Sequence, residues 1–420
     1  MAAIRARHKV LGMLFLASIV TYLDRISIAA AAPHMKEDLG LTTAQMGYVF
    51  SAFVFAYGIF EIPSGWLGDR FGPRRVLTRV VLWWSAFTAA TGAVRSYFSL
   101  LACRFLFGAG EAGFFPNSSC AISRWFPFGE RARAQGIVWT ASRLGAALTP
   151  AIALPLQAWL GWRPVFFLFG ATGLLWAIPW YLWFRDYPGQ KAGVSAPELL
   201  EIGESGPAPH ASLSWKVALS SANLWAVMLM YHTYCYAAYW FFSWMPTYLV
   251  KAKGIEAFAT YAALPYLMGA AANVAGGYTS DFMVRKVGLK WGRRSVGLVS
   301  MASAGGFMLL SIILQNKLLA IIALSLSFAV SDFMLPNCWA VCLDIGKRYA
   351  GTVSGAMNMA GQMGSTIAAA AYGSLVEKHG WNLPLAGMAA LSLASALIWL
   401  RIDPTKQLVP EKQPALAPQS

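Results

Sequence analysis

Hydrophobic and polar positions in this chain alternate in long blocks rather than residue by residue. The apolar blocks have roughly the 20 residues that a membrane-crossing helix needs, and short polar segments separate them. Because a bilayer offers the backbone no water to hydrogen-bond, such blocks are expected to be helical. The pattern predicts an all-α membrane protein with twelve transmembrane helices, at 10–32, 45–67, 76–94, 99–121, 134–157, 163–184, 222–249, 259–283, 295–314, 318–342, 352–375 and 383–401.

One longer polar segment divides these helices into two groups of six. It is rich in Pro, Gly, Ser and Glu, which is typical of a linker. No small-residue cleavage site follows the first apolar block, so we expect a retained helix there rather than a signal peptide. The predicted organisation is a six-helix bundle at 1–184, a cytoplasmic linker at 185–221, a second six-helix bundle at 222–401 and a cytoplasmic tail at 402–420.

The composition excludes an ordinary soluble protein. Charged residues make up 12% of the chain, whereas soluble domains have about 25%. The net charge of +15 would suggest nucleic acid binding in a soluble protein, but here the distribution of basic residues explains it. With the N-terminus inside, 23 of the 33 Lys and Arg residues fall in inner segments, 7 in outer segments and 3 within helices. This bias predicts a multi-pass plasma membrane protein with both termini cytoplasmic, surrounded by lipid and without a nucleic acid partner.

The cysteines and histidines show no pattern of a metal or catalytic site. The five cysteines lie in or beside apolar blocks, and the five histidines are scattered along the chain. A membrane-embedded enzyme would need His, Asp or Glu gathered at the spacing of a metal or nucleophile site. We therefore expect neither enzymatic activity nor a bound metal.

A glycine-rich, basic motif recurs at the same place in each half. After the second predicted helix the chain reads Gly-Trp-Leu-Gly-Asp-Arg-Phe-Gly-Pro-Arg-Arg from Gly65 to Arg75. After the eighth it reads Gly-Gly-Tyr-Thr-Ser-Asp from Gly276 to Asp281. This echo predicts two parallel six-helix repeats, with a binding site between them near the middle of the membrane.

The glycines of the motif allow two helices to approach closely, and its Asp can pair with a loop Arg or cap a helix N-terminus. An interaction that forms when one face of the protein closes and breaks when it opens would act as a gate. The alternative is that both segments are only basic inner loops. The predicted gating residues are Gly65, Asp69, Arg70, Arg74 and Asp281.

Four charged residues lie inside the first and fourth predicted helices, where each costs roughly 3 kcal/mol or more to insert. Asp24 and Arg25 are adjacent in the first helix. Arg104 and Glu111 are two turns apart in the fourth helix and therefore share a face. A structural ion pair would explain two of these charges but not four. Carboxyls beside an Arg in a low-dielectric site can instead couple proton binding to anion binding.

The motif from Gly65 matches the signature of the major facilitator superfamily, and further segments narrow the match. These are Tyr22 to Arg25, Arg104 to Asn117, Arg124 to Ala134, Trp339 to Asp344 and Gly351 to Asn358. Together they resemble the anion:cation symporter branch. That branch includes sialin, the vesicular glutamate transporters and bacterial permeases for galactonate, hexuronates, tartrate and phthalate.

The resemblance covers essentially the whole chain. It implies the major facilitator fold and proton-coupled movement of a small organic anion by alternating access, in the bacterial inner membrane. It also implies a monomer that needs no cofactor besides the protons that serve as coupling ion. By this resemblance Arg25 holds the carboxylate of the substrate, Asp24 and Glu111 carry protons, and Arg104 moderates them.

Arg143 departs from the family pattern, because sugar-acid carriers of this branch more often have a neutral amide near this position. A third Arg inside the membrane suggests a second anionic group on the substrate. The alternative is that Arg143 is the partner of Glu111 or Asp24.

Other polar residues in the helices are also predicted to contact substrate. Asp332 shares a face with Trp339, although Pro336 will bend that helix. Asn358 and Gln362, four residues apart, form a polar face. Polar contacts between helices are the alternative. The predicted substrate-binding residues are Tyr22, Arg25, Tyr57, Arg143, Asp332, Trp339, Asn358 and Gln362, whereas Glu61 is expected to pair with a neighbour on the cytoplasmic side.

These observations predict a proton-coupled symporter that takes up an organic anion, most simply a sugar acid or another small carboxylate. An exporter or antiporter of amphipathic compounds is the alternative within transport, and the arginines disfavour it because they favour anions. A non-transporting membrane sensor or receptor is the alternative from a different class.

Overall fold

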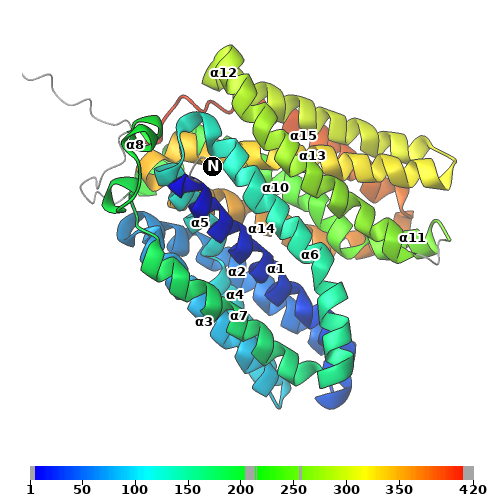
Figure 1. Ribbon diagram of the computed structural model, residues 1–420. Coiled ribbons are helices and arrows are strands. Elements are labelled where there is room, and N and C mark those ends of the chain that lie inside the picture. Colours follow the sequence, from blue (N-terminus) through cyan, green and yellow to red (C-terminus); the bar gives the residue numbers. More distant parts are fainter. Residues whose placement is uncertain (1–4, 204–212, 214, 255–257, 410–420) are drawn as a thin grey trace, which may run out of the picture.

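The computed structural model describes residues 5–203, 213, 215–254 and 258–409, and in these ranges the chain is helical, without a strand. Figure 1 shows the helices in two groups, with the linker between them. The first group is α1 (Ala6–Asp38), α2 (Thr43–Phe71), α3 (Pro73–Ala93), α4 (Tyr97–Glu111), α5 (Phe114–Trp125), α6 (Arg131–Leu160) and α7 (Trp162–Trp183). The linker holds α8 (Ala196–Ile202) and α9 (Trp215–Ser220). The second group is α10 (Ala222–Ser243), α11 (Met245–Lys251), α12 (Phe258–Ile313), α13 (Lys317–Gly346), α14 (Ala350–His379) and α15 (Asn382–Trp399).

Eight helical segments of the described chain are long and apolar enough to cross a membrane. Two of them, Ala263–Ile313 and Lys317–Ala368, are each long enough to cross twice. The apolar helices α3 and α10 add two more crossings, so the arrangement agrees with the twelve predicted ones.

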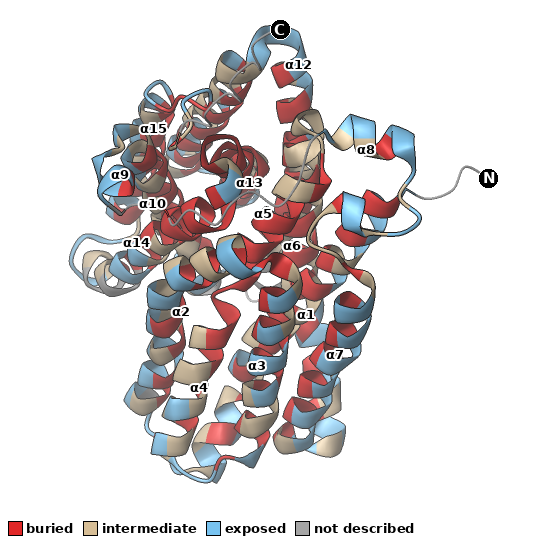
Figure 2. Ribbon diagram, turned by 90° about the vertical axis from the view of Figure 1, so that its left-hand side faces the viewer, coloured by how far each residue is buried: buried red, intermediate tan, exposed pale blue. Residues whose placement is uncertain are grey.

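The outward surface of the helices is apolar. In Figure 2 the buried residues concentrate where α5, α6 and α13 meet, whereas the outer surfaces of α3, α4 and α7 are largely exposed. Large hydrophobic side chains lie on this exposed surface, including Phe98 at 76%, Trp159 at 80% and Leu175 at 73% exposure. Such a surface is stable against lipid and would aggregate in water.

Two predicted helices are broken in the structure. The predicted helix at 99–121 is two helices, because α4 ends at Glu111 and α5 begins at Phe114. Gly113 and Pro116 explain this break, since Pro116 has no N–H to donate to the preceding turn. The predicted helix at 222–249 likewise ends at Ser243, and α11 starts with a proline in its first turn.

Two other predicted helices, at 259–283 and 295–314, are joined in the structure as α12. The chain stays helical up to Gly288, which adopts φ 80° and ψ 167°, and the second limb follows directly. Only Gly adopts this backbone conformation without strain, so the loop expected between the two helices reduces to a turn at this residue.

The two helix groups meet at one end of the molecule, which we call the linker face because α8 lies there, and diverge toward the opposite far face (Figure 1). The linker is held against this face. The buried carboxylate of Glu198 in α8 accepts hydrogen bonds from the backbone N–H groups of Ala6 (3.1 Å) and Arg7 (2.9 Å), which open α1. The described part of the linker is therefore anchored at the N-terminus of α1, where the negative charge also interacts favourably with the helix dipole.

The first residues of the predicted tail are anchored on the same face. Leu408 donates a backbone hydrogen bond to Ile345 (2.8 Å), and Asp403 pairs with Lys290 (3.2 Å). The remainder of the tail, 410–420, lies outside the described residues.

Candidate functional site

A central cavity of about 240 Å³ lies between the two helix groups. Aromatic side chains form much of its wall, among them Phe53, Phe115, Trp139 and Phe242. The structure brings six of the predicted substrate-binding residues into this wall, namely Tyr22, Arg25, Tyr57, Arg143, Asn358 and Gln362. The cavity is thus lined by both halves and contains two guanidinium groups among aromatic rings, hydroxyls and amides.

Arg25 is held by one carboxylate and a group of rings. Its Nε and Nη2 lie 3.1 and 3.0 Å from Oε1 of Glu111. The guanidinium also lies over the rings of Tyr22 (5.1 Å), Phe53 (5.1 Å) and Tyr57 (4.6 Å), where cation–π attraction stabilises it. The side chain remains 20% exposed, so it can reach an anion in the cavity while its position is fixed.

Asp24, the neighbour of Arg25 in α1, is fully buried and does not line the cavity. Neither carboxylate oxygen accepts a well-formed hydrogen bond, and the neighbours that interact with it are Glu111, Trp84 and Arg104. An ionised carboxylate without hydrogen-bond donors is costly to bury. The site therefore favours the protonated, neutral form of Asp24.

Arg104 lies behind the cavity wall. It is 2% exposed, and its guanidinium carbon lies 5.0 Å from the ring of Phe53 and 4.4 Å from that of Phe107. Its electrostatic neighbours are Glu111, Arg25 and Asp24. The four charges predicted from the sequence thus form one cluster, in which Arg104 influences the others without contacting the cavity.

Arg143 forms a buried ion pair that joins the two halves. Nε and Nη2 of this α6 residue lie 2.6 and 2.9 Å from the carboxylate of Asp332 in α13. The hydroxyl of Tyr234 (2.6 Å) and the amide of Asn273 (3.1 Å) also donate to Asp332. Arg143 is therefore paired with Asp332 rather than with Glu111 or Asp24, which were the expected alternatives.

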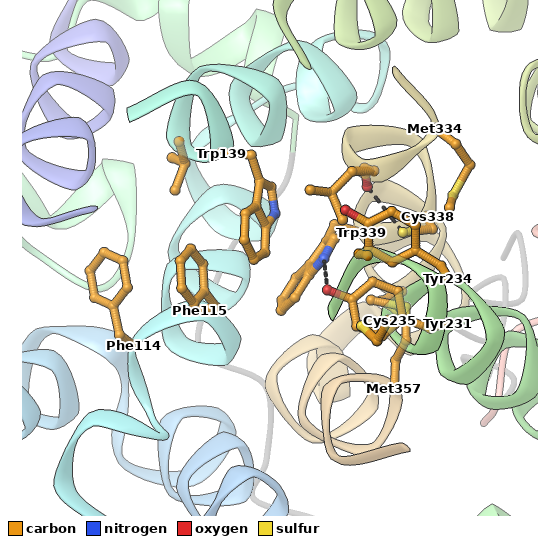
Figure 3. Close-up of a cluster of buried hydrophobic side chains, with 14 of the residues drawn as sticks. Phe114, Phe115, Trp139, Tyr231, Tyr234, Cys235, Met334, Cys338, Trp339 and Met357 are labelled. Atoms are coloured by element: carbon orange, nitrogen blue, oxygen red, sulfur yellow. Dashed lines mark hydrogen bonds between the residues drawn. The ribbon is translucent and has the colours of Figure 1, made fainter. Parts of the chain in front are cut away.

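Asp332 and Trp339 do not line the cavity themselves. Asp332 reaches it through Arg143, and Trp339 is fully buried beneath it. Figure 3 shows the indole of Trp339 among Phe115, Trp139 and Tyr231, which come from both halves. Phe115 and Trp139 stack at 4.2 Å, Trp139 lies 5.3 Å from Trp339, and the indole N–H of Trp339 donates to Tyr231 (3.3 Å). These rings close the cavity toward the linker face.

Glu61 was expected to pair with a neighbour on the cytoplasmic side, whereas its partner is Asn358, within a helix of the other half. Glu61 lies one helical turn from Tyr57 and is completely buried. Its Oε1 accepts a short hydrogen bond from the amide of Asn358 in α14, whose Nδ2 also lies 3.4 Å from the Tyr57 hydroxyl. Sequence separation conceals this contact, because the two residues belong to different halves.

Asp69, at the end of α2, caps the N-terminus of α14. Its carboxylate accepts hydrogen bonds from the backbone N–H groups of Gly351 (2.8 Å) and Thr352 (2.7 Å) and from the Thr352 hydroxyl (2.6 Å). Of the two predicted possibilities for this Asp, helix capping is the one that the structure contains. The negative charge also interacts favourably with the positive end of the helix dipole.

Asp281, in the second half, caps a helix N-terminus of the first half. It accepts hydrogen bonds from the backbone N–H groups of Ala132 (3.2 Å) and Arg133 (2.8 Å), which open α6. Arg293 lies between Asp281 and Asp344, 3.1 Å from each. Asp69 and Asp281, called the gate aspartates below, therefore fasten each half to a helix N-terminus of the other and close the linker face.

The other residues of the predicted gate have separate positions. Gly65 packs directly on Gly351 of α14. Arg70 is exposed and lies over the rings of its own helix. The backbone N–H of Arg74 donates to Asp186 (2.8 Å), and burial raises the pKa of that carboxyl although this hydrogen bond opposes the rise. Within the described part of the chain, the hydrogen bonds and ring contacts of Arg70 and Arg74 all stay within the first half and the adjoining linker.

We predict that Gly65→Ala opens the linker face. A Cβ at this position would lie 2.1 Å from the carbonyl oxygen of Gly351, so α2 and α14 must separate. Overpacking of this kind costs about 1–3 kcal/mol, which shifts the population of the closed state by roughly 5- to 150-fold. The readout is the labelling rate of a cysteine at Thr352. Gly47→Ala, in the same helix but with open space at its Cβ, should label like the parent protein, and equal rates for both variants would contradict the prediction.

A larger groove of about 850 Å³ continues the cavity between the halves. It shares Val54, Tyr239 and Ser365 with the central cavity. Its other lining residues come from α2, α4 and α14 and carry no charge, so it offers nothing to neutralise an anion. The charged site is confined to the central cavity.

Comparison with known proteins places the chain in context. The sequence model of the Major Facilitator Superfamily matches residues 14–369. A protein of Cupriavidus necator named a probable sulfoacetate transporter is 36% identical over 409 residues, which span 96% of this chain and 95% of that protein. A probable galactarate/D-glucarate transporter of Bacillus subtilis is 31% identical over 96% of this chain and 93% of its own length.

Solved structures share the fold. The human organic anion transporter MFSD10 superposes with a TM-score of 0.76 at 16% identity, over 94% of this chain and 100% of the other. The proton:xylose symporter XylE superposes with a TM-score of 0.73 at 15% identity, over 95% of this chain and 96% of the other.

Proposed function

The chain belongs to the major facilitator superfamily, and from that premise we propose that it takes up a small organic anion with two anionic groups, together with protons. The family and the relatives are membrane transporters and not enzymes. The observation that carries the proposal is the pair of guanidinium groups, Arg25 and Arg143, in the wall of one small cavity. Each is balanced by a carboxylate that an anionic group of the substrate can replace.

Two of the similar proteins are named for doubly charged anions, which supports a substrate of this kind. Sulfoacetate carries a carboxylate and a sulfonate, and galactarate and glucarate carry two carboxylates. Hydroxyl and amide groups of the cavity wall, among them those of Tyr57, Asn358 and Gln362, can hydrogen-bond the other polar groups of such an anion.

Proton coupling follows from competition for Arg25. While Glu111 is ionised it neutralises Arg25, and a substrate carboxylate must displace it. A proton on Glu111 removes that competition and leaves the guanidinium free for the anion. Asp24 is favoured as neutral in the closed state, so the loaded protein needs to move less uncompensated charge when its halves reorient.

The conformational cycle uses the contacts on the linker face. We place this face in the cytoplasm because the basic loops gather there. With the gate aspartates capping helices of the opposite half, the cavity is closed toward the cytoplasm and continues into the groove toward the far face. Substrate and protons enter from that side, and release follows when the gate contacts break.

The test is uptake by the purified protein in liposomes, with radiolabelled sulfoacetate, D-glucarate and D-galactonate as probes. Under an inward proton gradient, sulfoacetate should accumulate and the singly charged galactonate should accumulate at least about tenfold less, a difference of about 1.4 kcal/mol. Collapse of the gradient with an ionophore should abolish accumulation. Accumulation driven only by an outward proton gradient would instead demonstrate antiport, and transport of none of the anions would exclude the proposal.

A further inference from the structure

Glu61 is a buried carboxyl that the mechanism above does not use. It lies on α2 between Tyr57, which lines the cavity, and Gly65, which packs at the gate. Its side chain is 0% exposed, and its Oε2 has no hydrogen-bond partner. Its Oε1 accepts the amide hydrogen bond of Asn358 from α14. The carboxyl therefore lies in the contact between the two halves, one helical turn from Tyr57 in the cavity wall.

The surroundings of Glu61 do not neutralise a negative charge. No Lys or Arg nitrogen of the described residues forms an ion pair with it. The groups that face it are Tyr57 on its own helix, Arg25 on α1, Glu111 on α4, Cys235 on α10 and the neutral amide of Asn358 on α14. Arg25 is already paired with Glu111. An ionised carboxylate that only neutral donors contact, and whose nearest cation is already paired, is unfavourable in such a site, whereas a protonated one is neutral.

The second half has a neutral amide at the corresponding position. Glu61 and Asn273 each lie eight residues before the gate aspartate of their half. The backbone oxygen of Glu61 packs on Gly355 and that of Asn273 on Gly136, so that an added Cβ would lie 2.6 and 2.4 Å away. The same close contact thus accommodates an uncharged side chain in one half and a carboxyl in the other. Packing does not require the acid.

The contact in which Glu61 is buried is the one that opens in the transport cycle. The gate contacts of Gly65 and Asp69 with α14 lie about one and two turns further along α2 toward the linker face. When these contacts break, α2 and α14 separate, and water from the linker face reaches Glu61. Hydration favours the ionised form, so the carboxyl releases its proton on that side.

We propose that Glu61 is a third proton-binding residue of the transport cycle. It accepts a proton from the cavity side while the linker face is closed and releases it to water at the linker face when α2 separates from α14. In each turn one O–H bond forms on the carboxylate and later breaks, so one proton crosses with the substrate in addition to those on Asp24 and Glu111. This role rests on the proposed proton-coupled uptake.

The deciding experiment is the proton-to-substrate ratio of Glu61→Gln. Purified protein in liposomes is given fixed proton gradients and membrane potentials, and the potential at which net sulfoacetate flux stops is measured. The variant should carry one proton fewer per substrate than the parent protein, with sulfoacetate affinity within about threefold. Glu377→Gln, the same change at an exposed position on α14, should keep the parent ratio.

A second measurement does not depend on transport. Infrared spectra should show the carbonyl stretch of a protonated carboxylic acid in the parent protein, and part of this band should disappear in Glu61→Gln but not in Glu377→Gln. An unchanged ratio or an unchanged band would each overturn the role of Glu61. Absence of any gradient-driven uptake by the parent protein would be the separate failure of the proposed function.

Discussion

Replacing Arg25 by Ala is expected to weaken binding of sulfoacetate by at least about 30-fold and to abolish its uptake. Arg25 lines the cavity, remains 20% exposed and lies over three aromatic rings. Truncating one member of a buried, hydrogen-bonded charge pair costs about 2–5 kcal/mol, and each 1.4 kcal/mol is tenfold in affinity. Isothermal titration calorimetry on the purified variant measures the loss directly.

Two further variants separate lost substrate contact from damage to the fold. Arg25→Ala leaves Glu111 without its partner, so the double variant with Glu111→Gln removes both members of the pair. The double variant should regain thermal stability without regaining affinity. Arg95→Ala, at an exposed position, controls for the loss of one positive charge. Retention of parent affinity by the double variant would exclude Arg25 as the anion-binding residue.

The second large effect is expected for Asp24→Asn and Glu111→Gln. Both should leave exchange of sulfoacetate across the membrane largely intact while uptake driven by a proton gradient falls to background. The amides imitate protonated carboxyls, so the substrate can still bind and the protein can still reorient, but no proton is released. Glu111→Gln should also bind sulfoacetate equally well across the pH range, whereas the affinity of the parent protein should rise as the pH falls.

These variants are best compared in one set of liposomes. Counterflow with sulfoacetate on both sides measures exchange, and a pH jump with an empty lumen measures coupled uptake. Gradient-driven accumulation by both variants would show that the protons are carried elsewhere. Loss of exchange as well as uptake would show that the two carboxyls are needed for binding or reorientation itself.

The sequence predicts the membrane architecture and the position of the proposed gate residues, because local sequence patterns specify both. Apolar blocks of the right length specify helices. Gly65 and Asp69 recur in the second half as Gly277 and Asp281, and this repeat identifies the equivalent segments. The breaks at Gly113 and Pro246 also have local causes, but a glycine or proline inside an apolar block predicts a break less reliably than a block predicts a helix.

The pairing of the buried charges could not be predicted. Arg143 and Asp332 are 189 residues apart and lie in different halves, and nothing in either segment indicates the other. The sequence equally allowed Glu111 or Asp24 as partners, since any two opposite charges in apolar helices can form a pair. Glu61 and Asn358 also belong to different halves, so their contact becomes apparent only in the folded structure. The sequence identifies the charged residues, but the packing of the halves determines which of them interact.

The two arginines of the cavity wall, Arg25 and Arg143, differ in when they can be neutralised during synthesis. Arg25 and Glu111 both belong to the first half, so their pair can form as soon as α4 has been inserted. Arg143 has to wait for Asp332, which leaves the ribosome much later. Until α13 arrives, the newly made first half holds an unpaired guanidinium in lipid, at roughly 3 kcal/mol. Expressed alone, this half is consequently a substrate for membrane quality control, and co-expression with the second half should rescue it.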